Sequence, residues 1–267
     1  MQIQRKIRIR SLDGNDIPAV IHLPQTDYKK KTDHSMVVLA HGIFSNKDER
    51  GRFIRQAKLH VKNGSKAIRF DFRGHGDSTV PSKEVTVAGM IIDFQSVLNY
   101  ARSIATGSLF VVASSFGASV FLLYLQTQAK ILPDRIVFLN PVVDYRATML
   151  QAELAWGKSL FNEKGFDELN RTGYITLEEG FKMRAAMVVE LSIFRPYESF
   201  RFLEIPTRVI HGDKDSKVPY SVTKHYSLLS KSVDFRTIEG ADHAFKTPST
   251  EKKSFELIME WLYGAQT

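Results

Sequence analysis

The sequence contains no cysteine among its 267 residues. Disulfides, thiolate metal sites and a cysteine nucleophile are therefore excluded together. Covalent catalysis by this chain would have to use another nucleophile. No residue pattern predicts a metal site or a cofactor, and we expect neither.

Long apolar runs are also missing. No stretch approaches the roughly 18 to 20 apolar residues that a membrane span requires, so we expect no transmembrane segment. Residues 1–10 alternate basic residues with isoleucine and lack the continuous apolar centre of a signal peptide. These absences predict a cytoplasmic protein.

Acidic residues are fewer than basic ones, 29 against 37, which gives a formal charge of +8. We interpret most of this excess as solvated surface. Where it influences binding, it favours acidic partners through electrostatic steering. No zinc-finger spacing or aromatic RNA-binding strand accompanies the charge, so we predict no nucleic-acid partner.

The chain does contain a regular alternation of strands and helices. Residues 3–9 and 17–23 alternate apolar and polar side chains around a turn at 13–16, which predicts an antiparallel hairpin. Continuous apolar runs predict buried strands at 36–40, 67–72, 109–113, 135–141 and 207–211, with a last strand at 233–238. Helical spacing predicts helices at about 47–62, 87–105, 118–125 and 220–230, and a final one around 255–262. This pattern predicts an α/β fold with a mostly parallel sheet and helices on both faces.

The alternation is interrupted between residues 142 and 206, where helical segments rich in aromatic residues appear without a strand-like run. We predict a core domain formed by residues 1–141 and 207–267, and a helical cap formed by residues 142–206. Most of the aromatic side chains should form the core of this insertion. A subset, for which Trp156 and Phe161 are the candidates, would face the main domain and form an apolar substrate pocket.

One strand is followed by a pattern typical of a serine nucleophile. The apolar run from Leu109 ends in Ala113-Ser114-Ser115-Phe116-Gly117, with a small residue two positions to either side of Ser115. Such a sharp strand–turn–helix holds a serine hydroxyl at the end of a buried strand, beside the free N–H groups of the helix start. By itself the pattern is equally typical of an ordinary turn.

A base and a carboxylate follow later in the chain. Asp213 and Asp215 come after the strand at 207–211, and Asp242 and His243 come after the strand at 233–238. Because the carboxyl ends of parallel strands gather at one edge of the sheet, we expect these loops to meet Ser115. A serine hydroxyl needs a base within hydrogen-bonding reach, and the base needs a carboxylate to orient it.

Five motifs in this order resemble those of the α/β-hydrolases. They are His41-Gly42-Ile43, the run from Arg69 to Ser78, the turn at Ser115, Gly212-x-x-Asp215-x-x-Val218-Pro219 and Gly240-Ala241-Asp242-His243-x-Phe245. The chain is most similar to small bacterial esterases and related serine acylhydrolases, including cinnamoyl (feruloyl) esterases and monoglyceride lipases. The resemblance implies the α/β-hydrolase fold.

The resemblance also implies roles. Ser115 would be the nucleophile, His243 the general base and then acid, and Asp215 the orienting carboxylate. The backbone N–H groups of Ile43 and Phe116 would form the oxyanion hole, and Asp213 and Asp242 are interpreted as loop or surface residues. Ala113 departs from the glycine that is common at its position, and Ser114 stands where histidine is frequent.

The other seven histidines are interpreted as structural residues or as surface residues. His41, His75 and His211 lie in loops that form the fold, and we expect them to be structural. A second group is expected at the surface: His22, His34, His60 and His225.

The predicted reaction is hydrolysis of a small-molecule carboxylic ester or thioester, in which the acyl group is transferred to water through an acyl-enzyme. The basic surface adds the possibility of a thioester presented by an acidic acyl-carrier protein. The alternatives are a non-catalytic hydrolase-like binding module and an acyltransferase with the same three residues. The sequence does not indicate an oligomeric state.

Overall fold

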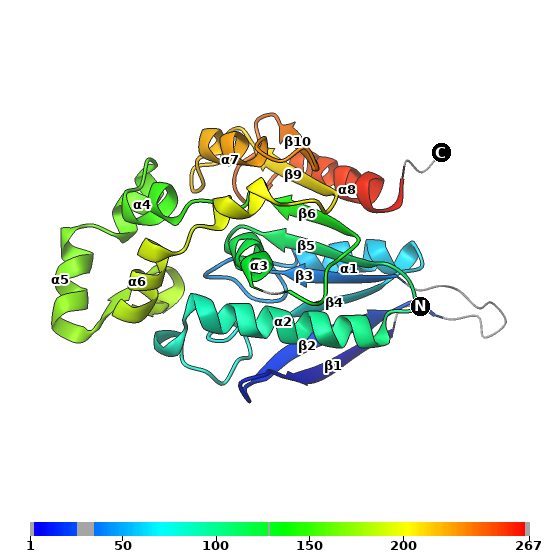
Figure 1. The fold of residues 1–267 in the computed structure, drawn as a ribbon, viewed down its shortest axis with the longest axis horizontal. Coiled ribbons are helices and arrows are strands. Elements are labelled where there is room, and N and C mark those ends of the chain that lie inside the picture. Colours follow the sequence, from blue (N-terminus) through cyan, green and yellow to red (C-terminus); the bar gives the residue numbers. More distant parts are fainter. Residues whose placement is uncertain (1–2, 26–34, 128, 265–267) are drawn as a thin grey trace.

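The computed structural model describes residues 3–25, 35–127 and 129–264. In these residues an eight-stranded sheet has the order β1-β2-β4-β3-β5-β6-β9-β10 (Figure 1). Its strands are β1 (Ile3–Arg10), β2 (Asp16–Leu23), β3 (Met36–Ala40), β4 (Lys66–Phe70), β5 (Leu109–Ser114), β6 (Arg135–Leu139), β9 (Thr207–Gly212) and β10 (Val233–Ile238). The pairs β1–β2 and β2–β4 are antiparallel and the others are parallel. The predicted hairpin and the mostly parallel sheet are confirmed.

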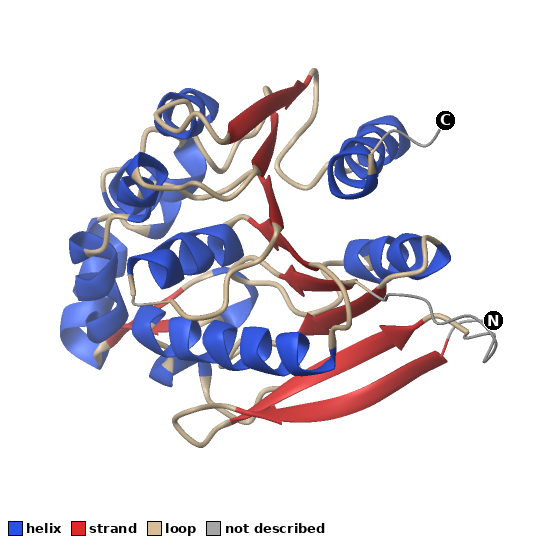
Figure 2. Ribbon diagram, turned by 45° about the vertical axis from the view of Figure 1, so that its right-hand side comes forward, coloured by secondary structure: helices blue, strands red, loops and turns tan. Residues whose placement is uncertain are grey.

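Helices cover both faces of the sheet (Figure 2). In the described chain, the α-helices outside residues 142–206 are α1 (Arg52–Lys62), α2 (Val87–Ile104), α3 (Phe116–Gln126), α7 (Tyr220–Ser227) and α8 (Pro248–Tyr263). Alternate strand residues face opposite layers. Val38 and Val111 belong to the core beneath α2 and α3, whereas Val37 and Val112 belong to the core beneath α1 and α8. Burial on both faces explains why these strands are continuously apolar.

Several predicted boundaries are wrong. The strand expected to reach residue 72 ends at Phe70, and the final helix, expected around 255–262, begins at Pro248. The helix expected from about residue 47 begins at Arg52, because Glu49, Arg50 and Gly51 have φ angles of 45°, 55° and 84°, outside the helical region. The strand expected to reach residue 141 ends at Leu139, before Asn140 with φ of 44°. The helix expected to reach residue 230 ends at Ser227.

Residues 142–206 lie between β6 and β9 in the chain and outside the main sheet (Figure 1). They contain a π-helical turn η2 (Arg146–Leu150), helices α4 (Ala155–Leu160), α5 (Glu163–Thr172) and α6 (Ala185–Ile193), and the 3₁₀ segments η3 (Glu178–Gly180) and η4 (Pro196–Arg201). A further 3₁₀ segment, η1 (Ser82–Glu84), precedes α2.

The expectation that this segment has no strands is wrong. The short strands β7 (Tyr174–Thr176) and β8 (Lys182–Arg184) pair antiparallel. Three residues are too few to establish an alternating pattern, and the turn between the strands depends on left-handed backbone at Glu179 and Gly180.

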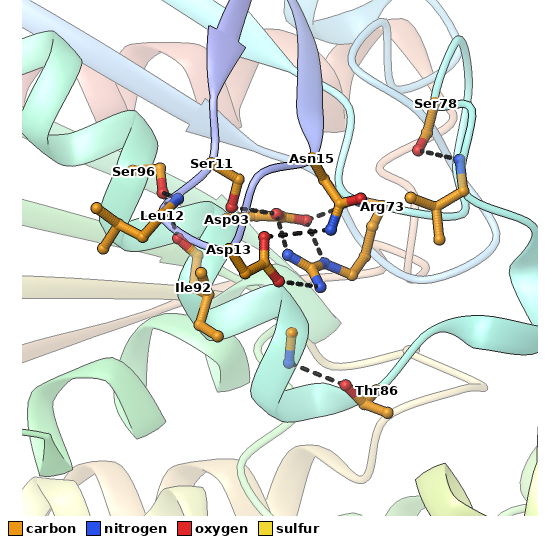
Figure 3. A network of polar contacts seen from close by, with 12 residues as sticks. Ser11, Leu12, Asp13, Asn15, Arg73, Ser78, Thr86, Ile92, Asp93 and Ser96 are labelled. Carbon is orange, nitrogen blue, oxygen red and sulfur yellow. Dashed lines mark hydrogen bonds and ion pairs between the residues drawn. The ribbon is translucent and has the colours of Figure 1, made fainter.

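A cluster of polar contacts around Arg73 joins the N-terminal hairpin, the loop after β4 and α2 (Figure 3). The Arg73 guanidinium, in the loop after β4, donates to both oxygens of Asp93 on α2 at 2.6 and 2.9 Å. It also lies 2.8 Å from Asp13, in the β1–β2 turn. Ser11 completes the cluster by donating to Asp93. These contacts fix the loop that follows β4 against the sheet edge.

Among the helices of the described residues, none combines the length and the apolar character that crossing a bilayer requires.

Candidate active site

Ser115 occupies a constrained turn between β5 and α3. Its φ and ψ are 50° and −116°, a combination that a non-glycine residue adopts only when its surroundings impose it. Its N–H donates to the Leu139 carbonyl at 2.9 Å, and its own carbonyl accepts from Val142 at 3.1 Å. The end of β6 therefore holds the Ser115 backbone in this conformation.

Ser115, His243 and Asp215 form a hydrogen-bonded series. His243 Nε2 is 3.1 Å from Ser115 Oγ, and His243 Nδ1 is 2.7 Å from Asp215 Oδ2. Because a carboxylate only accepts, Nδ1 carries the proton and donates it to Asp215. Nε2 is then the acceptor for the serine hydroxyl. The three residues lie in the loops after β5, β9 and β10, at one edge of the sheet.

The second oxygen of Asp215 is held by its own loop. Asp215 Oδ1 accepts from the backbone N–H groups of Lys217 and Val218 at 2.8 and 2.9 Å. Burial alone would raise the pKa of Asp215, but the His243 and His211 imidazoles and their hydrogen bonds hold it below its ordinary value. His211 Nε2 lies 3.2 Å from the oxygen that faces His243. Asp215 therefore stays ionised beside His243.

The two competing aspartates have other partners. Asp213 accepts from the Gly240 N–H at 2.6 Å. Asp242 accepts from the Lys246 N–H at 2.9 Å and lies 3.3 Å from the Lys246 ammonium. Both therefore stabilise loops, and Asp215 is the carboxylate that meets the His243 imidazole.

Two backbone N–H groups are available near Ser115. Phe116 is the first residue of α3, so its N–H has no acceptor within the helix. Ile43 follows β3 and lines the same cavity as Ser115. In the part of the chain that the structure describes, neither N–H donates to another group. Both can therefore donate to a developing negative charge.

A cavity of about 370 Å³ opens beside Ser115 and His243. Trp156 from α4 lines it, together with Phe44 and Val218. Phe161 lies elsewhere: it is buried in the same hydrophobic core as the residues beneath α2 and α3, and it lines a separate hollow with Phe166. Of the two predicted pocket residues, the structure brings only Trp156 to the cavity.

Trp156 is fixed by a contact between residues 142–206 and the loop after β9. Its Nε1–H donates to Glu178 at 2.7 Å, and the Lys217 ammonium binds the same carboxylate at 2.8 Å. Lys217 also lies over the Trp156 ring, 4.8 Å from its centroid. Burial alone would raise the pKa of Glu178, but hydrogen bonds from Lys217 and Trp156 lower it.

Two residues at the site were not predicted from the sequence. Asn140 donates from its side chain to the His243 carbonyl at 2.6 Å and accepts from the Gly212 N–H at 2.9 Å, which ties the His243 loop to β9. Glu49 lines the cavity, and Gly42 and Ser114 donate to its carboxylate at 3.3 and 3.4 Å. The Asn140-Pro141 sequence at the end of a buried strand was the available signal for Asn140.

Two of the histidines expected at the surface are fully buried, which corrects that expectation. His60 on α1 lies 2.9 Å from the Tyr263 hydroxyl, and burial lowers its pKa to about 3. His22 accepts from Arg69, and burial lowers its pKa to about 4. The pattern of apolar and polar residues does not reveal such buried histidines. Histidine has a polar side chain, yet it is stable in a core when its ring nitrogens are hydrogen-bonded. His225 is exposed, and His34 lies outside the described residues.

His41, His75 and His211 are buried, in agreement with their expected structural role, but His211 lies within β9 and not in a loop. His41 Nε2 accepts from the Phe72 N–H at 3.1 Å, and its Nδ1 lies 2.7 Å from the Gly42 carbonyl. The ring therefore links the loops after β3 and β4 and keeps Gly42 in place beside Ser115.

In residues 3–25, 35–127 and 129–264, no group of three or more histidine or carboxylate side chains could hold a metal ion.

Solved structures with a similar fold cover nearly the whole chain. Est1E from Butyrivibrio proteoclasticus, with ferulic acid bound, has a TM-score of 0.77 at 19% identity and covers 96% of this chain and 99% of its own. Alpha/beta hydrolase domain-containing protein 10 from mouse has a TM-score of 0.69 at 18% identity and covers 96% of this chain and 97% of its own. At these identities the likeness establishes the fold alone.

Sequence comparison gives a curated relative and a family. The human mitochondrial palmitoyl-protein thioesterase ABHD10 is 25% identical over 208 residues, which are 73% of this chain and 61% of the relative. This chain therefore matches less than two thirds of that relative. The model of the Alpha/beta hydrolase family matches residues 37–249. With its fold and most of its length matched, the chain belongs to the alpha/beta hydrolase family.

Proposed function

We propose that this protein is a serine hydrolase that cleaves carboxylic esters or thioesters through an acyl-enzyme intermediate. The observation that carries the proposal is the series Ser115 Oγ, His243 Nε2, His243 Nδ1 and Asp215 Oδ2, with spacings of 3.1 and 2.7 Å at its two hydrogen bonds. The name of the human relative, a thioesterase, is the reason to include thioesters.

Acylation begins when Ser115 Oγ attacks the carbonyl carbon of the substrate and its proton passes to His243 Nε2. The carbonyl oxygen becomes an oxyanion that accepts from the N–H groups of Ile43 and Phe116. Each donor contributes on the order of 3 kcal/mol to stabilising this intermediate. When the intermediate collapses, the bond to the alcohol or thiol breaks and His243 returns the proton to that leaving group.

Deacylation repeats these steps with water. His243 takes a proton from water, the hydroxide adds to the acyl carbon, and the carboxylic acid leaves as Ser115 recovers its proton. Asp215 holds the imidazole with its proton on Nδ1 and stabilises the imidazolium that forms in each step. Residues 142–206 would act as the cap, with Trp156 packed against the substrate.

The direct test replaces Ser115 with alanine. Ser115→Ala should retain its fold and lose at least about 10³-fold in hydrolysis of p-nitrophenyl butyrate. Ser114→Ala, which removes the adjacent hydroxyl, is the matched control and should keep most of the activity. A fluorophosphonate probe should label the wild-type protein on Ser115. Unchanged hydrolysis in Ser115→Ala, or no adduct on Ser115, would refute the proposal.

A second pair of variants tests the carboxylate. Asp215→Asn should lower kcat strongly, because an amide cannot stabilise the imidazolium. Asp213→Asn, in the same loop, should leave kcat close to the wild-type value. Equal losses in the two variants would contradict the assigned role of Asp215.

A further inference from the structure

The cavity beside Ser115 has more cationic than anionic side chains in its wall. Its cations are Arg50, Arg52, Arg55, Lys217 and Lys246, and its carboxylates are Glu49, Glu178, Asp242 and Glu251. Three of these cations lie within 4 Å of a carboxylate, in the pairs Arg55–Glu251, Lys217–Glu178 and Lys246–Asp242. Among the described residues, Arg50 and Arg52 have no carboxylate within that distance, and Glu49 is the one carboxylate of this wall outside the three pairs.

Arg52 is a buried cation that forms no ion pair within the part of the chain that the structure describes. Its guanidinium stacks on Phe245, 4.6 Å from the ring centroid, and donates to the neutral Ser254 hydroxyl at 3.0 Å. The Nε atom is buried, and among the described residues it has no hydrogen-bond partner. Burial lowers the pKa of Arg52 to about 10, so the group is still charged at neutral pH.

The two carboxylates nearest to Arg52 have other partners. Glu251 accepts two hydrogen bonds from Arg55, at 2.5 and 3.1 Å. Glu49 accepts from the Gly42 N–H and from the Ser114 hydroxyl. Both carboxylates favour the charged form of Arg52 through space, but within the described chain neither reaches ion-pairing distance of it. A ligand can therefore approach Arg52 without displacing an existing ion pair.

Arg50 lies at the cavity in a segment whose backbone is left-handed. It is the middle of three successive residues with positive φ, and its side chain is exposed and lines the cavity. No ion pair to Arg50 is found in the described part of the chain. A left-handed conformation at non-glycine residues has a free-energy cost of about 1 kcal/mol or more for each of them, and it persists where surrounding contacts impose it.

We propose that the substrate carries an anionic group, a carboxylate or a phosphate, which binds Arg52 inside the cavity and Arg50 at its entrance. A buried, unpaired charge is costly, and an anion that arrives with the substrate supplies the missing partner. Guanidinium groups suit both anions because they donate through two parallel N–H bonds. The proposal rests on the proposed function, since the anion is part of the ester or thioester that Ser115 attacks.

The test compares substrate pairs that differ in charge. Mono-p-nitrophenyl glutarate and its methyl ester place the charge on the acyl group. Butyryl-coenzyme A and butyryl-N-acetylcysteamine place it on the leaving group. At low salt, kcat/KM should be about 10-fold or more higher for the charged member of at least one pair, as expected for a charged hydrogen bond. The pair that responds identifies which side of the scissile bond carries the anion.

Variants assign this preference to the two arginines. Arg52→Gln should lower the charged-to-neutral ratio of kcat/KM about 10-fold, with the neutral substrate much less affected. Arg52→Lys should restore part of the ratio. Arg50→Gln, at an exposed position that folding should tolerate, should lower it about threefold. Arg236→Gln on β10 removes one positive charge away from the cavity and should leave the ratio unchanged.

The possible outcomes separate this inference from the proposed function. Equal kcat/KM within both pairs, with hydrolysis that still depends on Ser115, would refute the anion site and leave the hydrolase intact. If no substrate is hydrolysed, calorimetric titration of the wild-type protein and Arg52→Gln with monomethyl glutarate and with coenzyme A decides the question. Binding of either anion that is lost in Arg52→Gln would support the site, and equal or absent binding would overturn it.

Discussion

At the scale of single residues, the position of Ser115 depends on how closely α3 approaches β3. A Cβ atom on Gly117 would lie 2.4 Å from the His41 carbonyl oxygen and 2.9 Å from that of Ala40. Backbone atoms cannot move aside as a flexible side chain can. Glycine at position 117 therefore sets the distance between the helix that begins at Phe116 and the strand that precedes Ile43.

Gly117→Ala should displace the start of α3. The added methyl group would meet backbone oxygens, and such overpacking costs about 1–3 kcal/mol. The shift should also separate Ser115 from His243, so kcat/KM for p-nitrophenyl butyrate should fall together with the free energy of unfolding in urea.

Ala113→Gly is the matched control, on the other side of Ser115. It removes a methyl group and should cost about 1 kcal/mol of stability while retaining the activity. If Gly117→Ala were as active and as stable as the wild-type protein, this account of the turn would be wrong.

At the scale of elements, the loop that follows β4 is held by the buried Arg73–Asp93 pair. The Asp93 side chain is 1% exposed and that of Arg73 is 9% exposed, whereas Asp13 on the other side of Arg73 is 31% exposed. A charge left without its partner in such surroundings is strongly destabilising. The two aspartates should therefore differ in their importance for stability.

Asp93→Ala should lower the free energy of unfolding by about 3–5 kcal/mol, because it removes the buried partner of Arg73 and leaves the partly exposed Asp13 as the carboxylate beside the guanidinium. Asp13→Ala should cost about 1 kcal/mol, as is usual for a partly exposed pair. Urea titration followed by tryptophan fluorescence measures both values. Similar costs for the two variants would show that burial does not determine the contribution of this cluster.

At the scale of the whole molecule, the buried histidines connect stability to pH. Burial lowers the pKa to about 4 for His22, to about 3 for His60 and to about 4 for His75, and it holds that of His41 well below its ordinary value. The folded chain therefore keeps these rings neutral at pH values where the unfolded chain protonates them. Their contribution to stability is complete above about pH 6.5 and is lost as the pH falls toward 4.

The free energy of unfolding should decrease between pH 6.5 and pH 5 by about 1.4 kcal/mol per pH unit for each of these histidines. His60→Gln should make this dependence shallower by one such contribution. Urea titrations at pH 7, 6 and 5 measure the slope for both proteins. A stability that is constant over this range would contradict the neutral, buried state of these rings.

Some features of the fold are determined by local sequence. The buried strands appear as continuous apolar runs, because each is covered on both faces, and the N-terminal hairpin follows from alternation around a turn. The turn at Ser115 was recognisable from small residues at fixed positions. This turn is followed along the chain by loops that contain aspartate and then histidine. That order indicates where a site would lie.

Other features were decided only by the tertiary structure, because they depend on contacts between residues far apart in the chain. Local patterns do not distinguish the buried His60 from an exposed histidine, and three-residue strands such as β7 are too short to have a period. Asp215 was distinguished from Asp213 by resemblance to a family, whereas the structure distinguishes them by the hydrogen bonds that each accepts. Phe161 and Trp156 were equal candidates until the folding of residues 142–206 brought Trp156 to the cavity. The charge of Arg52 is visible in the sequence. Its burial, against Phe245 and Ser254 and with no ion pair among the described residues, arises only when α1, α8 and the loop after β10 pack together.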